Sequence, residues 1–112
     1  MPNQMAQLDL LFQALADPTR RAVVERLSRG PTATSELAQP FKMALPSFLQ
    51  HLDVLQKCGL VQSQKSGRVR TYELAPNTLK TAEDWMATQR TLWERRLDQL
   101  DSFLDDLKEQ TE

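Results

Sequence analysis

Hydrophobic residues near the start of the chain recur at three- and four-residue steps, which predicts two amphipathic helices. The first runs from about residue 5 to residue 16 and places Leu8, Leu11, Phe12 and Leu15 on one face. Asp17 and Pro18 then begin a second helix, because aspartate caps helix N-termini and proline suits the first helical position. Gly30 and Pro31 end this helix.

The next segment predicts a short helix, a turn and a longer helix. Pro40 stops the helix that contains Glu36, Leu37 and Ala38, and a turn follows before Leu45. The longer helix ends at Gly59, where a left-handed backbone is easily adopted. Its spacing assigns Leu45, Phe48, Leu49, Leu52 and Leu55 to a core face, and it points Ser47, Gln50, Asp53 and Lys57 outward. Residues 34–57 therefore predict a helix-turn-helix.

Two short strands are predicted after this helix. Val61 to Lys65 and Val69 to Leu74 are joined through the turn dipeptide Ser66-Gly67. This hairpin is a candidate wing, so the expected fold is mainly α with a small β-hairpin.

The segment after Pro76 has a long helical pattern, predicted over residues 77–108. Its hydrophobic seam consists of Leu79, Ala82, Met86, Trp93, Leu97, Leu100, Leu104 and Leu107, with heptad-like steps from Trp93 onward. Such a helix is roughly 48 Å long at about 1.5 Å per residue, which is too long for so small a domain to cover. Either the helix breaks, or a second copy of the chain covers its seam.

Length and composition indicate a single domain over residues 1–112. The chain has 112 residues, of which 40% are hydrophobic, which is enough for one modest core. Residues 5–16 form an N-terminal helix, residues 17–74 the helix-turn-helix and wing, and residues 77–108 the long C-terminal helix.

The formal net charge of −1 hides a strong asymmetry along the chain. Residues 17–70 hold nine basic and four acidic side chains, whereas residues 71–112 hold five basic and ten acidic ones. This segregation gives one part of the molecule a positive field and keeps nucleic acid plausible as a partner despite the overall acidity.

Several classes of protein are not expected from these residues. One cysteine and one histidine exclude an intrachain disulfide and a metal site of the CxxC or HxxxH kind. A run of eighteen apolar residues and a secretory signal are both missing, so a cytoplasmic protein without membrane contact is expected. The residues present no paired acid and base, no phosphate-binding glycine loop and no nucleophile constellation, so neither an enzyme nor a cofactor is expected.

Four motifs in the expected order resemble the ArsR-type (arsenic-repressor-like) winged helix-turn-helix regulators. The motifs are the segments 12–21 (FQALADPTRR), 36–38 (ELA), 51–61 (HLDVLQKCGLV) and 66–72 (SGRVRTY). Each motif is weak alone, but all four in this order and spacing are a strong signal, and the resemblance extends from about residue 8 to residue 107.

The resemblance implies a homodimer in which the first and last helices form the interface. The interface residues expected are Leu8, Leu11, Phe12, Trp85, Trp93, Leu97, Leu100, Leu104 and Leu107. The two helices that follow the turns would enter successive major grooves, so the operator would be an inverted repeat with half-sites about 34 Å apart. Proteins with this pattern usually repress transcription.

Metal sensing is not expected, although many members of the family release DNA when a metal binds. The third-helix cysteines of such members are replaced here by Ala38, Gln39 and Pro40, and the last helix has neither histidine nor cysteine. The acidic residues of that helix more often form a solvated face than a metal site. The sequence is compatible with a small-molecule inducer but does not indicate one, since Trp85 and Trp93 fit an interface core better than a ligand pocket.

The candidate DNA contacts lie in the helix-turn-helix and the wing. They are Arg20, Arg21, Lys42, Ser47, Gln50, His51, Lys65, Arg68 and Arg70. Ser47 and Gln50 can hydrogen-bond base edges, whereas the arginines of the wing suit phosphates. His51 is expected to pack at the edge of its helix and bond backbone or phosphate, and Cys58 to be a small buried residue.

The most favoured function is a dimeric, sequence-specific DNA-binding repressor. The alternative is a winged-helix module that binds a protein partner without specific DNA binding. Leu49, which stands where the family commonly has serine, and Asp53, whose charge opposes phosphate, keep that alternative open.

Overall fold

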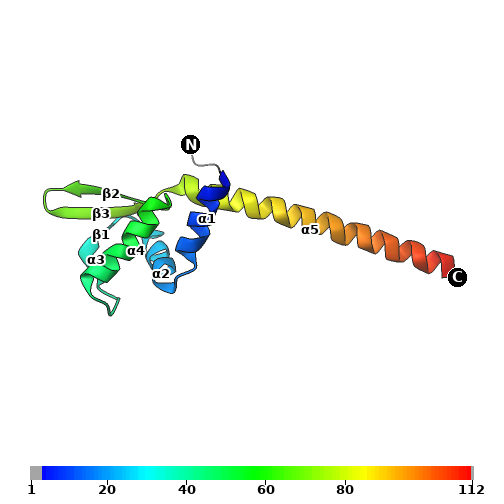
Figure 1. The fold of residues 1–112 in the computed structure, drawn as a ribbon, viewed down its shortest axis with the longest axis horizontal. Helices are drawn as coiled ribbons and strands as arrows, with labels where there is room; N and C mark the ends of the chain where they lie inside the picture. Colours follow the sequence, from blue (N-terminus) through cyan, green and yellow to red (C-terminus); the bar gives the residue numbers. More distant parts are fainter. Residues whose placement is uncertain (1–3, 112) are drawn as a thin grey trace. The chain divides into compact units, whose positions relative to one another are not determined.

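The structure is a computed structural model that describes residues 4–111, and it contains five helices and three strands within them (Figure 1). The elements are α1 (Gln4–Leu15), α2 (Pro18–Leu27), β1 (Thr32–Ala33), α3 (Thr34–Ala38), α4 (Leu45–Lys57), β2 (Val61–Ser66), β3 (Val69–Leu74) and α5 (Pro76–Thr111). The predicted mainly α fold with a small hairpin is confirmed. Only β1 was not expected from the sequence.

The described residues form two compact units, and the division between them falls inside α5. The first unit extends to Lys80 and contains every other element, whereas the second begins at Thr81 and consists of α5 alone. The sequence predicts a single domain, and the structure groups the same residues into these two units. The first unit is called the body below, and residues 81–111 are called the C-terminal helix.

The helix boundaries of the body follow the predicted capping residues. Asp17 is the N-cap of α2 and accepts a hydrogen bond from the backbone N–H of Arg20 at 3.1 Å. Gly59 follows the C-cap of α4 with a φ of +86°, the left-handed conformation in which glycine has no Cβ penalty.

The three strands form an antiparallel sheet in the order β1-β3-β2. Val61 pairs with Leu74 and Ser66 with Val69 in the hairpin, while Thr32 of β1 pairs with Tyr72 on the other edge of β3. Figure 1 shows the closed end of the hairpin projecting from the helices of the body. The sheet therefore anchors the wing at one end and leaves its tip exposed.

The core of the body is built from one residue set shared by the helices and the sheet. Its fully buried large side chains are Leu11, Val23, Leu37, Phe48, Leu52, Leu55 and Leu60. Cys58 is also buried, which confirms its predicted place. The expectation that Leu45 and Leu49 belong to this core is wrong, because they are 53% and 40% exposed.

Two residues expected at a dimer interface are buried within the chain itself. Leu8 is 6% exposed and Leu11 is 1% exposed, so neither has surface left for another subunit. The exposed hydrophobic residues of α1 are Met5, Leu10 and Phe12, of which only Phe12 was assigned to the interface.

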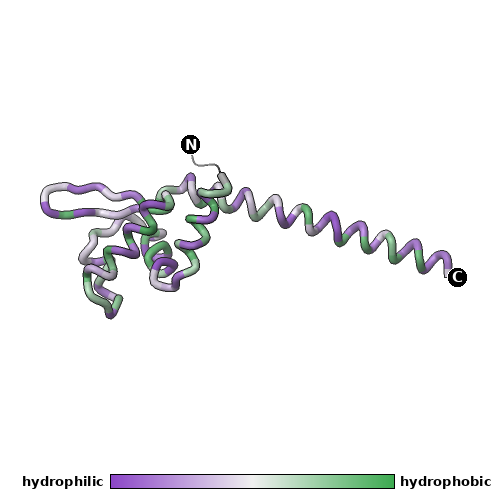
Figure 2. Tube along the Cα trace, in the orientation of Figure 1, coloured by the Kyte–Doolittle hydropathy of each residue, from purple (hydrophilic) through white to green (hydrophobic). Residues whose placement is uncertain are grey.

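The C-terminal helix continues to Thr111 without a break, so the first of the two alternatives for this segment is removed. Figure 2 shows hydrophobic and hydrophilic positions recurring along α5. From Met86 onward the side chains of the predicted seam are exposed, with Trp93 at 64% and Leu100 at 52%, whereas Ala82 is buried and Leu79 is half-buried. Within residues 4–111, no helix is long and apolar enough to cross a membrane.

Candidate nucleic-acid interface

The first half of α4 presents two kinds of side chain to solvent, uncharged polar ones and apolar ones. Ser47 and Gln50 are both exposed, as the sequence predicts, and Lys42 is exposed in the turn before the helix. The first turn of α4 holds no acidic residue. Asp53, the first acidic residue of the helix, forms an ion pair with Lys57 at 2.9 Å, so its charge is partly neutralised.

The wing is tied to α4 through a single hydroxyl group. Gln56 of α4 and Arg70 of β3 each donate a hydrogen bond of 2.9 Å to Ser63 Oγ of β2. A hydroxyl oxygen has two lone pairs, so it can accept both. This three-residue link connects the hairpin to α4, and it was not expected because its members lie on three different elements.

The tip of the wing carries the basic residues Lys65 and Arg68 on either side of a tight turn. Gly67 has a φ of +63°, which the turn requires. Lys65 pairs in register with Arg70, so three cationic side chains gather near the closed end of the hairpin. The carbonyl of Arg70 also accepts a hydrogen bond of 3.1 Å from Thr34 Oγ1, which connects the start of α3 to β3.

The side chain of Arg20 is engaged inside the body. Its Nε donates to the carbonyl of Ala14 at 2.7 Å and its Nη2 donates to that of Gln13 at 3.1 Å. Arg21 likewise donates from Nη1 to the carbonyl of Leu15 at 2.8 Å. These carbonyls belong to the last turn of α1, where that of Gln13 also accepts a hydrogen bond of 3.2 Å from the backbone N–H of Ala16, and both arginines add donors to this C-terminus. These hydrogen bonds give both arginines a structural role that does not depend on contact with phosphate.

Arg20 also reaches the recognition surface through His51 of α4. Its Nη1 lies 3.2 Å from His51 Nδ1, and Asp17 Oδ2 lies 3.7 Å from the same ring nitrogen. The backbone N–H of Arg20 is the main cause that holds the pKa of Asp17 below its usual range. The end of α1, the start of α2 and the middle of α4 therefore meet at one cluster, defined by Asp17, Arg20 and His51.

The structure thus divides the nine predicted DNA contacts into two groups. Lys42, Ser47, Gln50, Lys65 and Arg68 have exposed side chains on the turn, α4 and the wing tip. Arg20, Arg21, His51 and Arg70 have hydrogen bonds within the body, and Arg21 and Arg70 among them are exposed as well. The sequence did not identify Leu45 and Leu49 as surface residues of the same helix.

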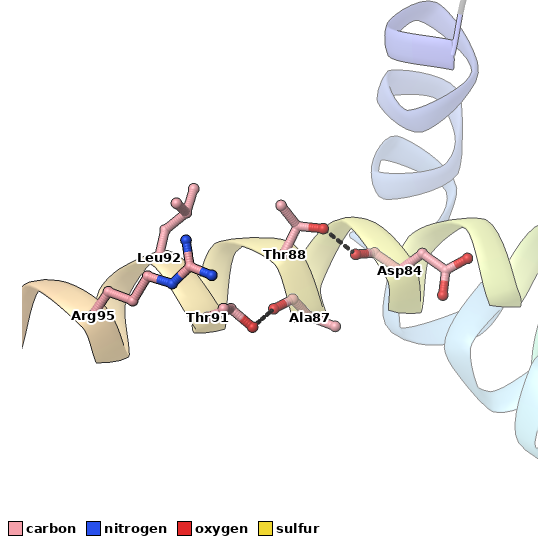
Figure 3. Close-up of a pocket in the computed structure, with 6 residues that line it drawn as sticks. All are labelled: Asp84, Ala87, Thr88, Thr91, Leu92 and Arg95. Atoms are coloured by element: carbon pink, nitrogen blue, oxygen red, sulfur yellow. Dashed lines mark hydrogen bonds between the residues drawn. The ribbon is translucent and has the colours of Figure 1, made fainter.

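A shallow depression on the C-terminal helix is not suited to a specific ligand. Its lining residues are Asp84, Ala87, Thr88, Thr91, Leu92 and Arg95, all from the same helix (Figure 3). Thr88 and Thr91 donate their hydroxyl hydrogens to the carbonyls of Asp84 and Ala87 at 3.0 Å, so the hydroxyls bond within the helix. Among residues 4–111, no group of three histidine, cysteine or acidic side chains is placed to hold a metal ion.

Comparisons with known proteins agree with this geometry. A family model described as a helix-turn-helix domain matches residues 15–64. The HTH-type transcriptional regulator Rv2034 of Mycobacterium tuberculosis is 48% identical over 63% of this chain and 66% of its own length. The transcriptional repressor SdpR of Bacillus subtilis is 29% identical over 68% of this chain and 84% of its own. The crystal structure of an ArsR family transcriptional regulator, RHA00566, superposes on this chain with a TM-score of 0.78. The match has 52% sequence identity and covers 84% of this chain and 97% of that protein's chain.

Proposed function

The chain belongs to the ArsR family of transcriptional regulators, and we propose that it acts as a homodimeric repressor that binds an inverted-repeat operator. The observation that carries this proposal is the exposed first half of α4 beside a basic wing that Ser63 fixes in place. A helix can enter the major groove, while cationic side chains next to it neutralise phosphates. The relative SdpR is named a transcriptional repressor, which supports repression as the outcome.

The residues of the interface have different roles in this proposal. Ser47 and Gln50 hydrogen-bond base edges, because their side chains are exposed on the first turns of α4. Lys42, Lys65 and Arg68 neutralise phosphates and supply affinity that does not depend on sequence. Arg20 acts on DNA binding indirectly, by holding His51 and therefore α4 in position.

Self-association is proposed from the exposed seam of the C-terminal helix. Trp93, Leu97, Leu100, Leu104 and Leu107 follow the spacing of a two-helix seam and are all exposed. A second copy of the same helix offers the same apolar stripe, so a symmetric pairing covers both. Two recognition helices about 34 Å apart would then read two half-sites.

No metal effector is part of this proposal. The positions where metal-sensing members of the family carry third-helix cysteines hold Ala38, Gln39 and Pro40. None of these three side chains has a thiol group that could bind a metal ion as a thiolate.

Selection of bound sequences from a random DNA library tests the function. The expected result is an enriched inverted repeat, protected in a footprint as two half-sites about one helical turn apart. Equal affinity for operator and random DNA at physiological salt would contradict the proposal. A chain that retains no DNA and recovers a stoichiometric protein partner would support the protein-interaction alternative.

Two substitutions separate the proposed roles on the selected DNA. Arg68→Ala should weaken binding to all sequences alike and reduce the slope of affinity against salt by about one counterion. Gln50→Ala should instead reduce the preference for the operator and leave the salt slope unchanged. The opposite pattern would overturn these assignments.

A further inference from the structure

Helix α4, the helix proposed to enter the major groove, carries an apolar patch on its exposed surface. Leu45 and Leu49 are one helical turn apart and are 53% and 40% exposed, and Ala44 and Pro46 beside them are exposed as well. The core of the body takes only Phe48, Leu52 and Leu55 from this helix. The patch is therefore not an extension of the core. It leaves one side of the first two turns of α4 open to a partner.

The patch lies on the side of α4 that faces the wing. Leu49 and Gln56 are seven residues apart, nearly two full turns, so they share one side of the helix. Gln56 donates to Ser63 of β2, which marks this side as the one next to the wing. Ser47 and His51 lie toward the other side, where His51 meets Arg20 and Asp17.

The charges around the patch suit DNA better than an apolar protein surface. Lys42 precedes it in the turn, and Lys65 and Arg68 are at the tip of the neighbouring wing. The first acidic residue of α4 is Asp53, which is paired with Lys57. In the major groove, base edges with apolar groups lie between two phosphate backbones. An apolar patch with cations on two sides is complementary to this arrangement.

We propose that Leu45 and Leu49 read the 5-methyl groups of thymines in the major groove. The thymine methyl is the apolar group that a base pair presents in this groove, and aliphatic side chains make favourable contact with it. This inference rests on the proposed function and adds a specificity that hydrogen bonding by Ser47 and Gln50 does not supply. Each operator half-site accordingly carries thymine opposite this flank of α4.

Replacing thymine by deoxyuridine tests the contact directly. The exchange removes one methyl group and keeps every hydrogen-bonding group of the base. At the thymine positions read by the patch, affinity of the full-length chain should fall about fourfold for each methyl lost, in line with the transfer free energy of one buried carbon. Exchanging both symmetric positions should give about tenfold or more.

The variant Leu49→Ala identifies the residue responsible. It should bind thymine DNA more weakly than the unaltered chain and should lose sensitivity to deoxyuridine at one position of each half-site, with Leu45→Ala doing the same at a neighbouring position. Leu10→Ala is the matched control, because Leu10 is similarly exposed at 49% but lies on α1. Its ratio of affinities for the two DNAs should equal that of the unaltered chain.

The outcomes separate the inference from the function on which it rests. If the unaltered chain binds its operator specifically but shows the same affinity for thymine and deoxyuridine at every position, the methyl contact is refuted and the repressor function stands. If the sensitivity survives in both leucine variants, the assignment to these residues is overturned. If the selection yields no preferred sequence at all, the proposed function itself fails.

Discussion

The body and the C-terminal helix use hydrophobic residues in opposite ways. In the body, Leu37, Leu52 and Leu55 are fully buried by elements of the same unit, whereas Trp93 and Leu100 of the C-terminal helix are more than half exposed. Burial of apolar side chains is the main favourable term in folding. The body therefore buries its own apolar side chains, whereas the seam of the C-terminal helix would gain the same benefit from the proposed pairing with a second copy.

The two regions also differ in charge. Residues 1–80 carry ten basic and six acidic side chains, whereas residues 81–112 carry four and nine. A positive body attracts phosphates, whereas an acidic helix repels them. In the proposed function, the body accordingly binds DNA and the helix pairs with a second copy.

The largest expected effect comes from a charge placed in the seam of the C-terminal helix. Leu100→Asp should raise the dissociation constant of the dimer by at least 100-fold, because a symmetric interface would bury two unpaired carboxylates. Analytical ultracentrifugation over a range of concentrations measures this change. Ser102→Asp is the control, since Ser102 is exposed on the opposite face of the helix, and it should leave the dimer intact.

A dimer that survives Leu100→Asp unchanged would break the comparison, because the seam would then not be the pairing surface. Loss of the body's helical signal in circular dichroism would also contradict the comparison, because the body would then depend on the C-terminal helix for its fold.

A smaller effect is expected from the cluster that positions α4. Arg20→Ala removes three side-chain hydrogen bonds and should lower the free energy of unfolding by about 1–3 kcal/mol, measured by urea denaturation at fixed protein concentration. Arg21→Ala removes one exposed bond and should cost less than about 0.5 kcal/mol. An unchanged stability with a salt slope reduced by about one would instead make Arg20 a phosphate contact.

The junction between α4 and the start of α5 gives the next prediction. Gly59 has a φ of +86°, and a Cβ there would lie 3.0 Å from Thr78 Oγ1, which donates to the carbonyl of Gly59 at 2.7 Å. Gly59→Ala should therefore cost about 2 kcal/mol. Gly67→Ala, with a φ of +63° and open space around the site, should cost about 1 kcal/mol. Equal costs in thermal unfolding would show that the Thr78 contact adds nothing.

The smallest effect concerns the N-cap of α2. The pKa of Asp17 is lowered in the folded chain, chiefly by the backbone N–H of Arg20, so its stabilisation is present above the ordinary value of 3.8 and is lost as pH falls below it. Asp17→Asn keeps a capping oxygen but removes the titration. Its free energy of unfolding should fall less steeply between about pH 4 and pH 2. Parallel profiles for the two chains would contradict this role.

Local patterns were sufficient to predict every described element except β1, but they did not predict every buried face. Helical spacing correctly places Phe48, Leu52 and Leu55 in the core, yet the same spacing includes Leu45 and Leu49, which are exposed. Periodicity identifies which residues share a side of a helix, whereas the extent of the surface that covers this side is a tertiary property. Phe48 is buried while Leu45 and Leu49 are exposed, so the core covers a narrower side of α4 than the spacing predicts.

The parts of the site that could not be predicted depend on contacts between distant residues. The strand β1 has only two residues and exists through its pairing with Thr71 and Tyr72, so it has no pattern of its own. The role of Arg20 depends on carbonyls of α1 and on His51, which is 31 residues away. A basic residue in a DNA-binding motif suggests phosphate contact, and only the fold shows that its guanidinium is already engaged.

The most direct test of the central claim is the affinity of the full-length chain for its selected operator, compared with the same DNA in which one half-site is scrambled. Because two bodies joined by the C-terminal helices bind together, two chains should occupy the intact operator, and scrambling should weaken binding by 100-fold or more. Equal affinity for both DNAs, with one chain bound to each, would contradict the account.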